Sequence, residues 1–212
     1  YRTGLVLWEG TPSDVNPLFA DWLNEPEGVI PVGIRVTSDQ PISVFVDNRE
    51  RESRDLHAAV SRAGLGRTYR IVAPPPTNGL PAIFAVVAAA DFTELTITPR
   101  NTVGEHIGGE SYTVSLNELE TYYLSDGEVD LTGTLIAADK KVAVVAGAVC
   151  AGAFVSCDHA VEGMPPYELW GSTLFTEPSV GGNVGDFFKV VSHLDNTRFW
   201  VTGFGNPVDL FS

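Results

Sequence analysis

The fold class is decided by one stretch, Phe84-Ala-Val-Val-Ala-Ala-Ala-Asp91, which is followed directly by Phe92-Thr-Glu-Leu-Thr-Ile-Thr98. Both halves are rich in β-branched and aromatic residues, and the second alternates strictly, which is the period-two pattern of β-strands. Asp91 between them favours a turn, because an aspartate side chain tolerates a left-handed backbone and bonds nearby amides. The stretch therefore predicts a β-hairpin with its turn at Asp91.

Similar short runs fill the rest of the chain and are separated by frequent Pro and Gly residues. Helical spacing is confined to two short candidates, Pro17–Leu23 and Arg54–Arg62. The pattern predicts an all-β antiparallel sandwich, with a barrel or a propeller as alternatives because these folds share short strands and frequent turns. The predicted strands are Ile34–Val36, Ile42–Val46, Tyr69–Val72, Phe84–Val87, Leu95–Thr98, Tyr112–Leu116, Thr121–Leu124, Val142–Val145, Phe188–Val191 and Phe199–Thr202.

The deciding stretch recurs later in the chain. Phe84–Asp91 aligns with Phe188-Lys-Val-Val-Ser-His-Leu-Asp195 at an offset of 104 residues, and the strand that follows aligns at the same offset. A second match aligns Val36–Val44 with Ile136–Val144 at an offset of 100 residues. A repeated order of elements indicates an internal duplication of about 100 residues.

The extra hairpin Tyr112–Leu124, with Asn117 at its turn, precedes the second copy. Because no Ser/Gly-rich linker divides the copies, residues 1–212 are expected to form one compact domain. Its two pseudo-repeats would cover about residues 1–99 and 100–203. Residues 1–32 and 204–212 have no clear repeat partner, and we expect them to complete the sheets of this same domain, with addition of strands to a neighbouring chain as the alternative.

Composition and charge exclude several classes of protein. The chain has 44% apolar residues, so it can build a core, and no run is long enough to cross a bilayer. With 27 acidic and 13 basic residues, the formal net charge is −14. Such a surface repels phosphate backbones, so nucleic acid is not an expected partner.

The two cysteines, Cys150 and Cys157, follow the most apolar run of the chain. No other Cys is present to build a zinc-type set, so we predict a disulfide that closes a small loop, with two reduced buried thiols as the alternative. A disulfide would place the protein in an oxidising compartment. The preceding strand, Val142–Val149, is apolar without alternation and is expected to be central and buried on both faces.

Asp158 and His159 lie just beyond this loop, and Asp55 and His57 occupy the similar place in the first copy. A nucleophile to match either pair is missing, because Ser156 reads as a turn residue and the sequence has no hydrolase elbow, zinc-protease motif or phosphate loop. We interpret both pairs as structural networks. The sequence thus predicts no enzymatic activity, no cofactor and no catalytic residue.

Two sets of carboxylates could in principle hold a cation. Asp39, Asp91, Asp139 and Asp195 mark four predicted turns, which we expect to lie in different places and not to converge. The stretch Asp126-Gly-Glu-Val-Asp130 offers oxygen ligands for calcium but lacks further spaced carboxylates. A solvated turn is the preferred interpretation, so no metal site is predicted.

Trp8, Trp22, Trp170 and Trp200 could offer stacking surfaces for sugars. Trp200 is predicted to be exposed, because Phe199 and Val201 define the apolar face of its strand.

The chain resembles the family of N-terminal domains of IgG-Fc-binding protein and its relatives in secreted and cell-surface proteins. The order Cys-Asp-His, Pro-Pro, Trp-Gly is the most specific part of the resemblance. The resembling residues are Gly33–Phe45, Phe84–Pro99, Leu116–Leu124, Asp130–Gly133, Val142–Cys150, Cys157–Glu162, Pro165, Pro166, Trp170, Gly171, Gly185, Asp186 and Asp195–Thr197. The resemblance implies an extracellular, non-enzymatic module of an adhesive, mucus-like or matrix protein.

Two functions remain open from the sequence. The first is a structural or adhesive module that acts through contacts with a protein partner or with itself. The alternative is a lectin-like module that binds glycans, with calcium assisting.

Overall fold

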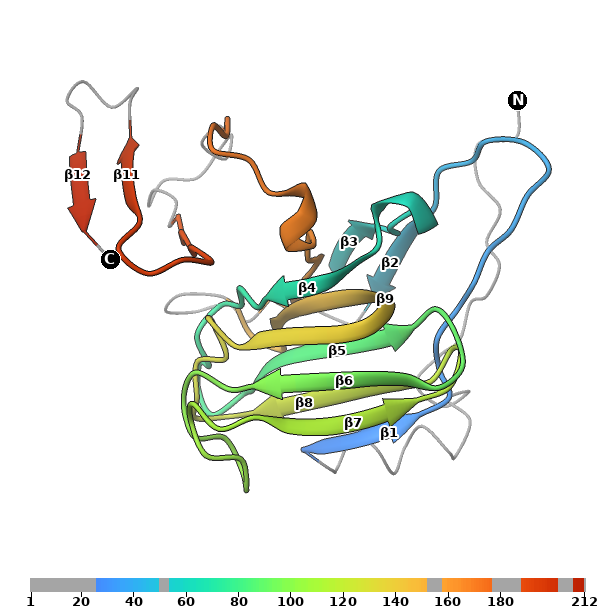
Figure 1. The fold of residues 1–212 in the computed structure, drawn as a ribbon, viewed down its shortest axis with the longest axis horizontal. Helices are drawn as coiled ribbons and strands as arrows, with labels where there is room; N and C mark the ends of the chain where they lie inside the picture. The colour runs from blue at the N-terminus through green and yellow to red at the C-terminus, as the bar shows by residue number, and fades with distance from the viewer. Residues whose placement is uncertain (1–25, 50–53, 152–157, 177–187, 202–207, 212) are drawn as a thin grey trace.

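The computed structural model describes residues 26–49, 54–151, 158–176, 188–201 and 208–211 (Figure 1). In these ranges the chain forms twelve β-strands and two short 3-10 turns, which confirms the all-β class. The elements are β1 Glu27–Ile30, β2 Phe45–Arg49, β3 Arg54–Ala58, η1 Arg62–Gly64, β4 Gly66–Arg70, β5 Ala82–Ala88, β6 Thr93–Thr98, β7 Tyr112–Leu116, β8 Thr121–Asp126, β9 Leu135–Ala148, β10 Ala160–Gly163, η2 Tyr167–Leu169, β11 Arg198–Val201 and β12 Val208–Phe211.

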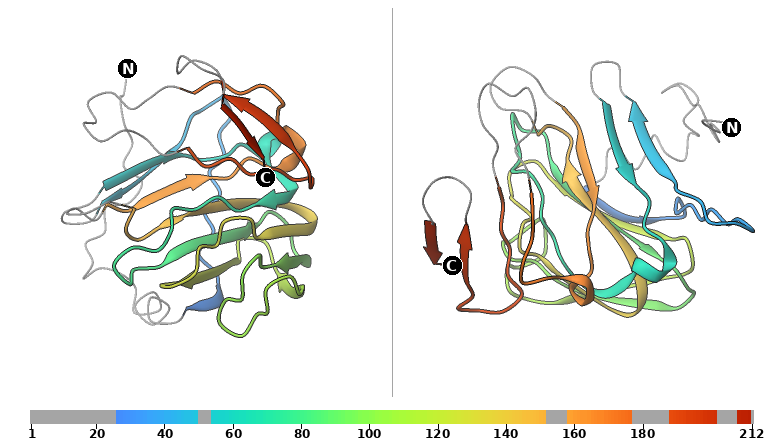
Figure 2. Two further views of the ribbon diagram at one scale, coloured as in Figure 1. Left: turned by 90° about the vertical axis from the view of Figure 1, so that its left-hand side faces the viewer. Right: turned by 90° about the horizontal axis from the view of Figure 1, so that it is seen from above.

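Eight of the described strands form one antiparallel sheet. Its order is β1-β8-β5-β9-β6-β7, and β4 and β10 are additional partners of β9. The sheet curls round its own core and is nearly barrel-shaped, as the views in Figures 1 and 2 show. Strands β2 and β3 pair as a separate hairpin, and so do β11 and β12.

Strand β9 is shared by the two sides of this curled sheet. Its first residues pair with β4 and β6, whereas its last seven pair with β5 and β10. Between these parts the strand curves round at the right of Figure 1, and its register with β4 shifts. The prediction that Val142–Val149 is central is confirmed. Burial on both faces is only partly correct, because Ala143 and Val145 are half-buried and Val149 is 38% exposed.

The two predicted hairpins, β5–β6 and β7–β8, are instead β-arches, in which two strands joined by a short turn do not pair with each other. Strands β5 and β6 do not pair with each other, because β9 lies between them. Likewise β7 pairs with β6, while β8 pairs with β5 and β1. In both cases a short turn carries the chain from one side of the core to the other. The hairpin predictions were wrong because a strand, a tight turn and a strand have the same local sequence in an arch as in a hairpin.

The core lies inside the curled sheet and is built by alternation. In β5, Ala82, Phe84, Val86 and Ala88 point inward, and the residues between them are half-buried. Inward residues of the neighbouring strands complete one continuous cluster. Its largest fully buried side chains are Tyr69, Tyr122, Phe84, Ile71, Leu95, Ile97, Leu116, Leu131 and Ile136.

Several predicted elements need correction. The helix candidate Arg54–Arg62 is strand β3 followed by η1, because pairing with β2 overrides a weak local helical tendency. Ile34–Val36 and Phe188–Val191 are not strands, and Ile42–Val46 becomes regular only from Phe45. The candidate Pro17–Leu23 lies outside the described residues.

The described strands do not show the predicted duplication as two six-stranded copies, so the two pseudo-repeats stay a prediction. Strand β9, which belongs to the second pseudo-repeat, lies in the same sheet as β5 and β6 of the first. Near the chain ends, β1 adds to the main sheet through β8, whereas β12 pairs with β11. Both pairings are within the chain, as expected for the described parts of these segments.

Candidate functional site

Three tight bends of the chain meet at one side of the sheet, which we call the arch edge. It consists of residues 89–92 between β5 and β6, residues 117–120 between β7 and β8, and residues 139–141 within β9. The first two bends are joined by backbone hydrogen bonds in both directions, from Leu119 N to Ala88 O at 2.9 Å and from Ala88 N to Glu120 O at 3.0 Å. The arch edge is therefore one continuous structure.

Aspartate side chains tie these bends together. Asp91 Oδ1 accepts a hydrogen bond from Glu118 N at 3.0 Å, and Asp139 Oδ1 accepts one from Glu94 N at 2.8 Å. The expectation that the Asp turns do not converge was wrong for this pair, because the arches place both at the same edge. The predicted turn at Asp91 is confirmed, because Asp91 lies between β5 and β6, whereas the predicted turn at Asp139 was wrong, because Asp139 lies within the continuous strand β9. Asp39 and Asp195 lie in exposed bends elsewhere.

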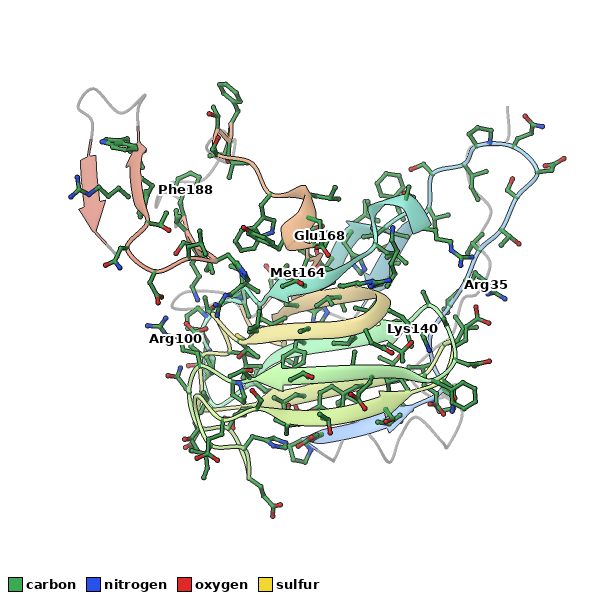
Figure 3. The ribbon with its side chains drawn as sticks, viewed as in Figure 1. Arg35, Arg100, Lys140, Met164, Glu168 and Phe188 are labelled. Atoms are coloured by element: carbon green, nitrogen blue, oxygen red, sulfur yellow. The ribbon has the colours of Figure 1, made fainter. Side chains whose placement is uncertain are left out.

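Lys140 fixes the bend that carries Phe92. Its ammonium nitrogen donates to Asp91 O at 2.7 Å and to Phe92 O at 2.6 Å. The side chain thus reaches from β9 across to the turn between β5 and β6. On the other side of the arch edge, Arg35 forms an ion pair with Glu118. Figure 3 labels Arg35 and Lys140 at this side of the sheet.

The arch edge holds two apolar residues with left-handed backbone, Phe92 and Leu119, and of these Phe92 is the exposed one. Its φ is +54°, a left-handed conformation that costs a bulky residue about 1–2 kcal/mol, and its side chain is 81% exposed. Neither burial nor backbone preference explains a phenylalanine here. An exposed aromatic ring on a turn that is held from three sides is suited to enter a pocket on another molecule.

A second cluster closes the open side of the sheet, between the two edge strands β1 and β7. Glu27 Oε2 lies 2.8 Å from His106 Nε2, and Tyr122 donates a hydrogen bond to Glu27 Oε1 at 2.7 Å. The hydroxyls of Tyr112 and Tyr122 are 2.7 Å apart, and the rings of His106 and Tyr112 stack with centroids 3.6 Å apart. The cluster connects β1, β7, β8 and the loop at His106.

Burial governs the titration of the two tyrosines. It raises the pKa of Tyr112 to about 12, although the hydrogen bond with Tyr122 acts the other way. Burial also raises the pKa of Tyr122, and its bonds to Tyr112 and Glu27 raise it further. Because both shifts are upward, the neutral tyrosines stabilise the fold fully below pH 10, and this contribution is lost as the pH rises above 10.

We expect a tyrosinate absorbance titration of the intact chain to show the raised pKa values of Tyr112 and Tyr122. Tyr112 should ionise in a late step near pH 12 or on alkaline unfolding. Tyr112→Phe should reduce the size of the late absorbance change without abolishing it, because the pKa values of Tyr69 and Tyr122 are also raised by burial. A single transition of all six tyrosines near pH 10 in a folded chain would contradict the cluster.

The stretch Asp126–Asp130, which was considered for calcium, forms a bend after β8, as preferred. Asp126 Oδ1 accepts hydrogen bonds from Glu128 N at 2.7 Å and Val129 N at 3.0 Å, which is a local cap. Asp130 Oδ2 lies 2.9 Å from Lys189 Nζ. Burial alone would raise the pKa of Asp130, but bonds from Thr132 and Lys189 hold it below its ordinary value. Among the described residues, no group of three or more His, Cys, Asp and Glu side chains is placed to hold a metal ion.

The two Asp/His pairs come near each other through neighbouring strands. Asp55 on β3 accepts hydrogen bonds from Leu56 N and from Val161 N of β10. Asp158 precedes β10, and its carbonyl accepts from Ala151 N at 2.7 Å. These bonds join the β2–β3 hairpin to the main sheet and close the turn after β9. They support the structural interpretation of Asp55 and Asp158.

Cys150 is fully buried at the end of β9. The pairing of β9 with β10 continues through the bond from Ala151 to Asp158, which returns the chain to Cys150. Cys157 lies outside the described residues, so its bond to Cys150 stays a prediction, supported by this return of the chain.

The aromatic predictions have a mixed outcome. Trp200 is 67% exposed, and Phe199 and Val201 are half-buried, which confirms the predicted faces of that strand. Trp170 is half-buried and its indole nitrogen donates to Pro165 O at 3.0 Å. Trp8 and Trp22 lie outside the described residues.

The most prominent features of the site were not predicted. Glu27 and His106 carry no local signal, because only the curling of the sheet brings them together. Phe92 had one usable signal, which is its alignment with Asn196. Asparagine is common in left-handed turns, so the alignment indicated a left-handed position occupied by an unsuited residue.

The described part of the chain is an all-β module whose arch edge carries an exposed aromatic ring. In the same residues, no helix has the length and apolar content to span a membrane.

Comparison with known proteins gives the family. The model of the family described as IgGFc binding protein matches residues 58–211, so the chain belongs to this family. It is similar to the human IgGFc-binding protein, with 31% identity over 142 residues. That match covers 65% of this chain but only 3% of the relative. No solved structure is significantly similar to it.

Proposed function

We propose that this chain is an extracellular, non-enzymatic module that binds another protein through the arch edge. The observation that carries the proposal is the exposed, left-handed Phe92. Natural sequences keep a locally unfavourable residue mainly where function requires it. The family supports a binding role, because its described member is named for binding the Fc part of IgG.

Binding would bury the Phe92 ring in an apolar pocket of the partner. Full burial of such a side chain contributes about 1.5–3 kcal/mol. The turn is already held by Lys140 and Asp91, so little conformational entropy is lost on binding. The net charge of −14 favours a partner with a basic rim around that pocket.

The candidates for the partner are the Fc part of IgG, which the name of the human relative supplies, and a second copy of this chain, as an adhesive assembly would require. Binding to immobilised Fc and sedimentation of the chain at high concentration test the two. We expect a saturable interaction in one of these formats. Silence in both would contradict the proposal.

Substitution of the anchor gives the sharper test. Phe92→Asn should weaken binding about 10- to 150-fold, which corresponds to the lost burial. It should leave the thermal midpoint unchanged or raise it, because asparagine suits φ of +54° better. Phe175→Asn is the matched control, since that ring is 95% exposed but lies outside the arch edge. Unchanged binding by Phe92→Asn would overturn the assignment.

A glycan array, run with and without a calcium chelator, separates the lectin-like alternative. The exposed Trp200 is the feature in its favour. Glycan binding that is lost in Trp200→Ala and retained in Phe92→Asn would replace protein binding as the function.

A further inference from the structure

The turn before β11 has the same geometry as the turn before β6. Thr93 Oγ1 donates to Ala90 O at 2.7 Å, and Thr197 Oγ1 donates to Leu194 O at 2.7 Å. The left-handed residues also correspond, with φ of +54° at Phe92 and +57° at Asn196. All three pairs are related by the 104-residue offset found in the sequence.

The strands that follow also correspond. Leu95 of β6 faces Val114 of β7, and its counterpart Phe199 of β11 faces Leu210 of β12. Alternation continues in step, because Leu95 and Ile97 turn inward in β6, and Phe199 and Val201 are the less exposed residues of β11. Residues 188–201 and 208–211, which we call the C-terminal unit, thus repeat the turn before β6 and the pairing of β6 with β7, whereas residues 188–191, the counterpart of the middle of β5, do not form a strand.

The two units differ in what covers their apolar residues. Val86 in β5 is completely buried, whereas its counterpart Val190 is 57% exposed. In the first unit, which consists of β5, β6 and β7, β9 covers the apolar residues, because it lies between β5 and β6 and pairs with both of them. In the C-terminal unit, β12 is the partner of β11 among the described strands, and no described strand takes the position of β9.

We propose that the C-terminal unit is an acceptor for a strand of a different protein. The occupant would be an extended segment with the chemistry of β9. It would run antiparallel to β11, as β9 runs to β6, and place apolar side chains at alternate positions against Val190, Phe199 and Val201. This surface is separate from the arch edge and does not depend on the function proposed for it.

A synthetic peptide of residues 135–148 is the probe, because this sequence fits between β5 and β6 of the first unit. It is added to the intact chain, and amide hydrogen exchange and calorimetry follow binding. We expect slower exchange in residues 188–191 and 198–201, with saturable heat. A peptide with Ile136→Asp and Val144→Asp should be silent, because both side chains are buried in β9.

Protein variants locate the site. Val201→Asp should abolish peptide binding, because it places a charge on the inward face of β11. Trp200→Thr is the matched control and should retain binding, since the corresponding residue of β6 is Thr96, on the opposite face. Both positions are partly exposed, so neither variant should disturb the main sheet.

Three results would overturn the proposal. One is the absence of protection at about 1 mM peptide, a concentration that half fills even a weak site. Another is exchange in β11 of the free chain that is already as slow as in β6, because the site would then be filled by the chain itself. The third is a dimer of the free chain that Val201→Asp separates, which would make a second copy the occupant.

Discussion

Replacement of Phe84 by alanine is expected to lower the free energy of unfolding by about 3–5 kcal/mol. Phe84 is 1% exposed, and its ring packs against Tyr122 with centroids 6.1 Å apart. Its strand is flanked by β8 and β9, so the surrounding backbone cannot close the cavity that the substitution leaves. Urea denaturation measures the change.

Phe188→Ala is the matched control, because Phe188 corresponds to Phe84 at the 104-residue offset but is 49% exposed. Its cost should be less than half as large. Equal losses from the two substitutions would show that both rings are equally buried in solution, and would contradict the different cover of the two units.

Gly147→Ala is expected to destabilise the fold by about 3 kcal/mol, at the upper end of the usual cost of overpacking. A Cβ at this position would clash with the carbonyl oxygen of Ala160. That oxygen belongs to the backbone of β10, which pairs with β9 at this point. Relief of the clash requires β10 to move away, so amide exchange in β10 should accelerate together with the loss of stability.

Gly171→Ala serves as the control for this substitution. Its nearest neighbour would be the carbonyl oxygen of Thr173 at 3.7 Å, an ordinary contact. The expected change is within about 0.5 kcal/mol. A Gly147→Ala protein as stable as this control would mean that β10 does not pack against β9 in solution.

The sequence was a good guide to strands and a poor guide to their partners. Tyr112–Leu116 is β7 with the predicted bounds, and Phe84–Val87 and Leu95–Thr98 lie within β5 and β6. Alternation is a local property, so it survives in any antiparallel arrangement. Partner choice is not local: β9 enters between β5 and β6 from almost forty residues further along the chain.

The candidate site likewise has features that depend on local sequence and features that depend on how distant strands pair. Asp91 was recognised as a turn residue, because turn preference is local, whereas Asp139 was wrongly predicted to lie in a turn and is part of β9. Their meeting at the arch edge depends on the path of β9 and could not be predicted. Phe92 gave only the indirect signal of its alignment with Asn196, and the Glu27 cluster gave none, since its members come from four separate segments.

The position of β9 also has a consequence for the order of events during synthesis. Strands β5 and β6 leave the ribosome before β9. In the native sheet they do not pair with each other, because β9 lies between them. Until residue 148 has emerged, their inward residues have no lasting cover, and they are open to wrong pairing. The sheet therefore forms late and in one step, when β9 pairs with β4, β5 and β6.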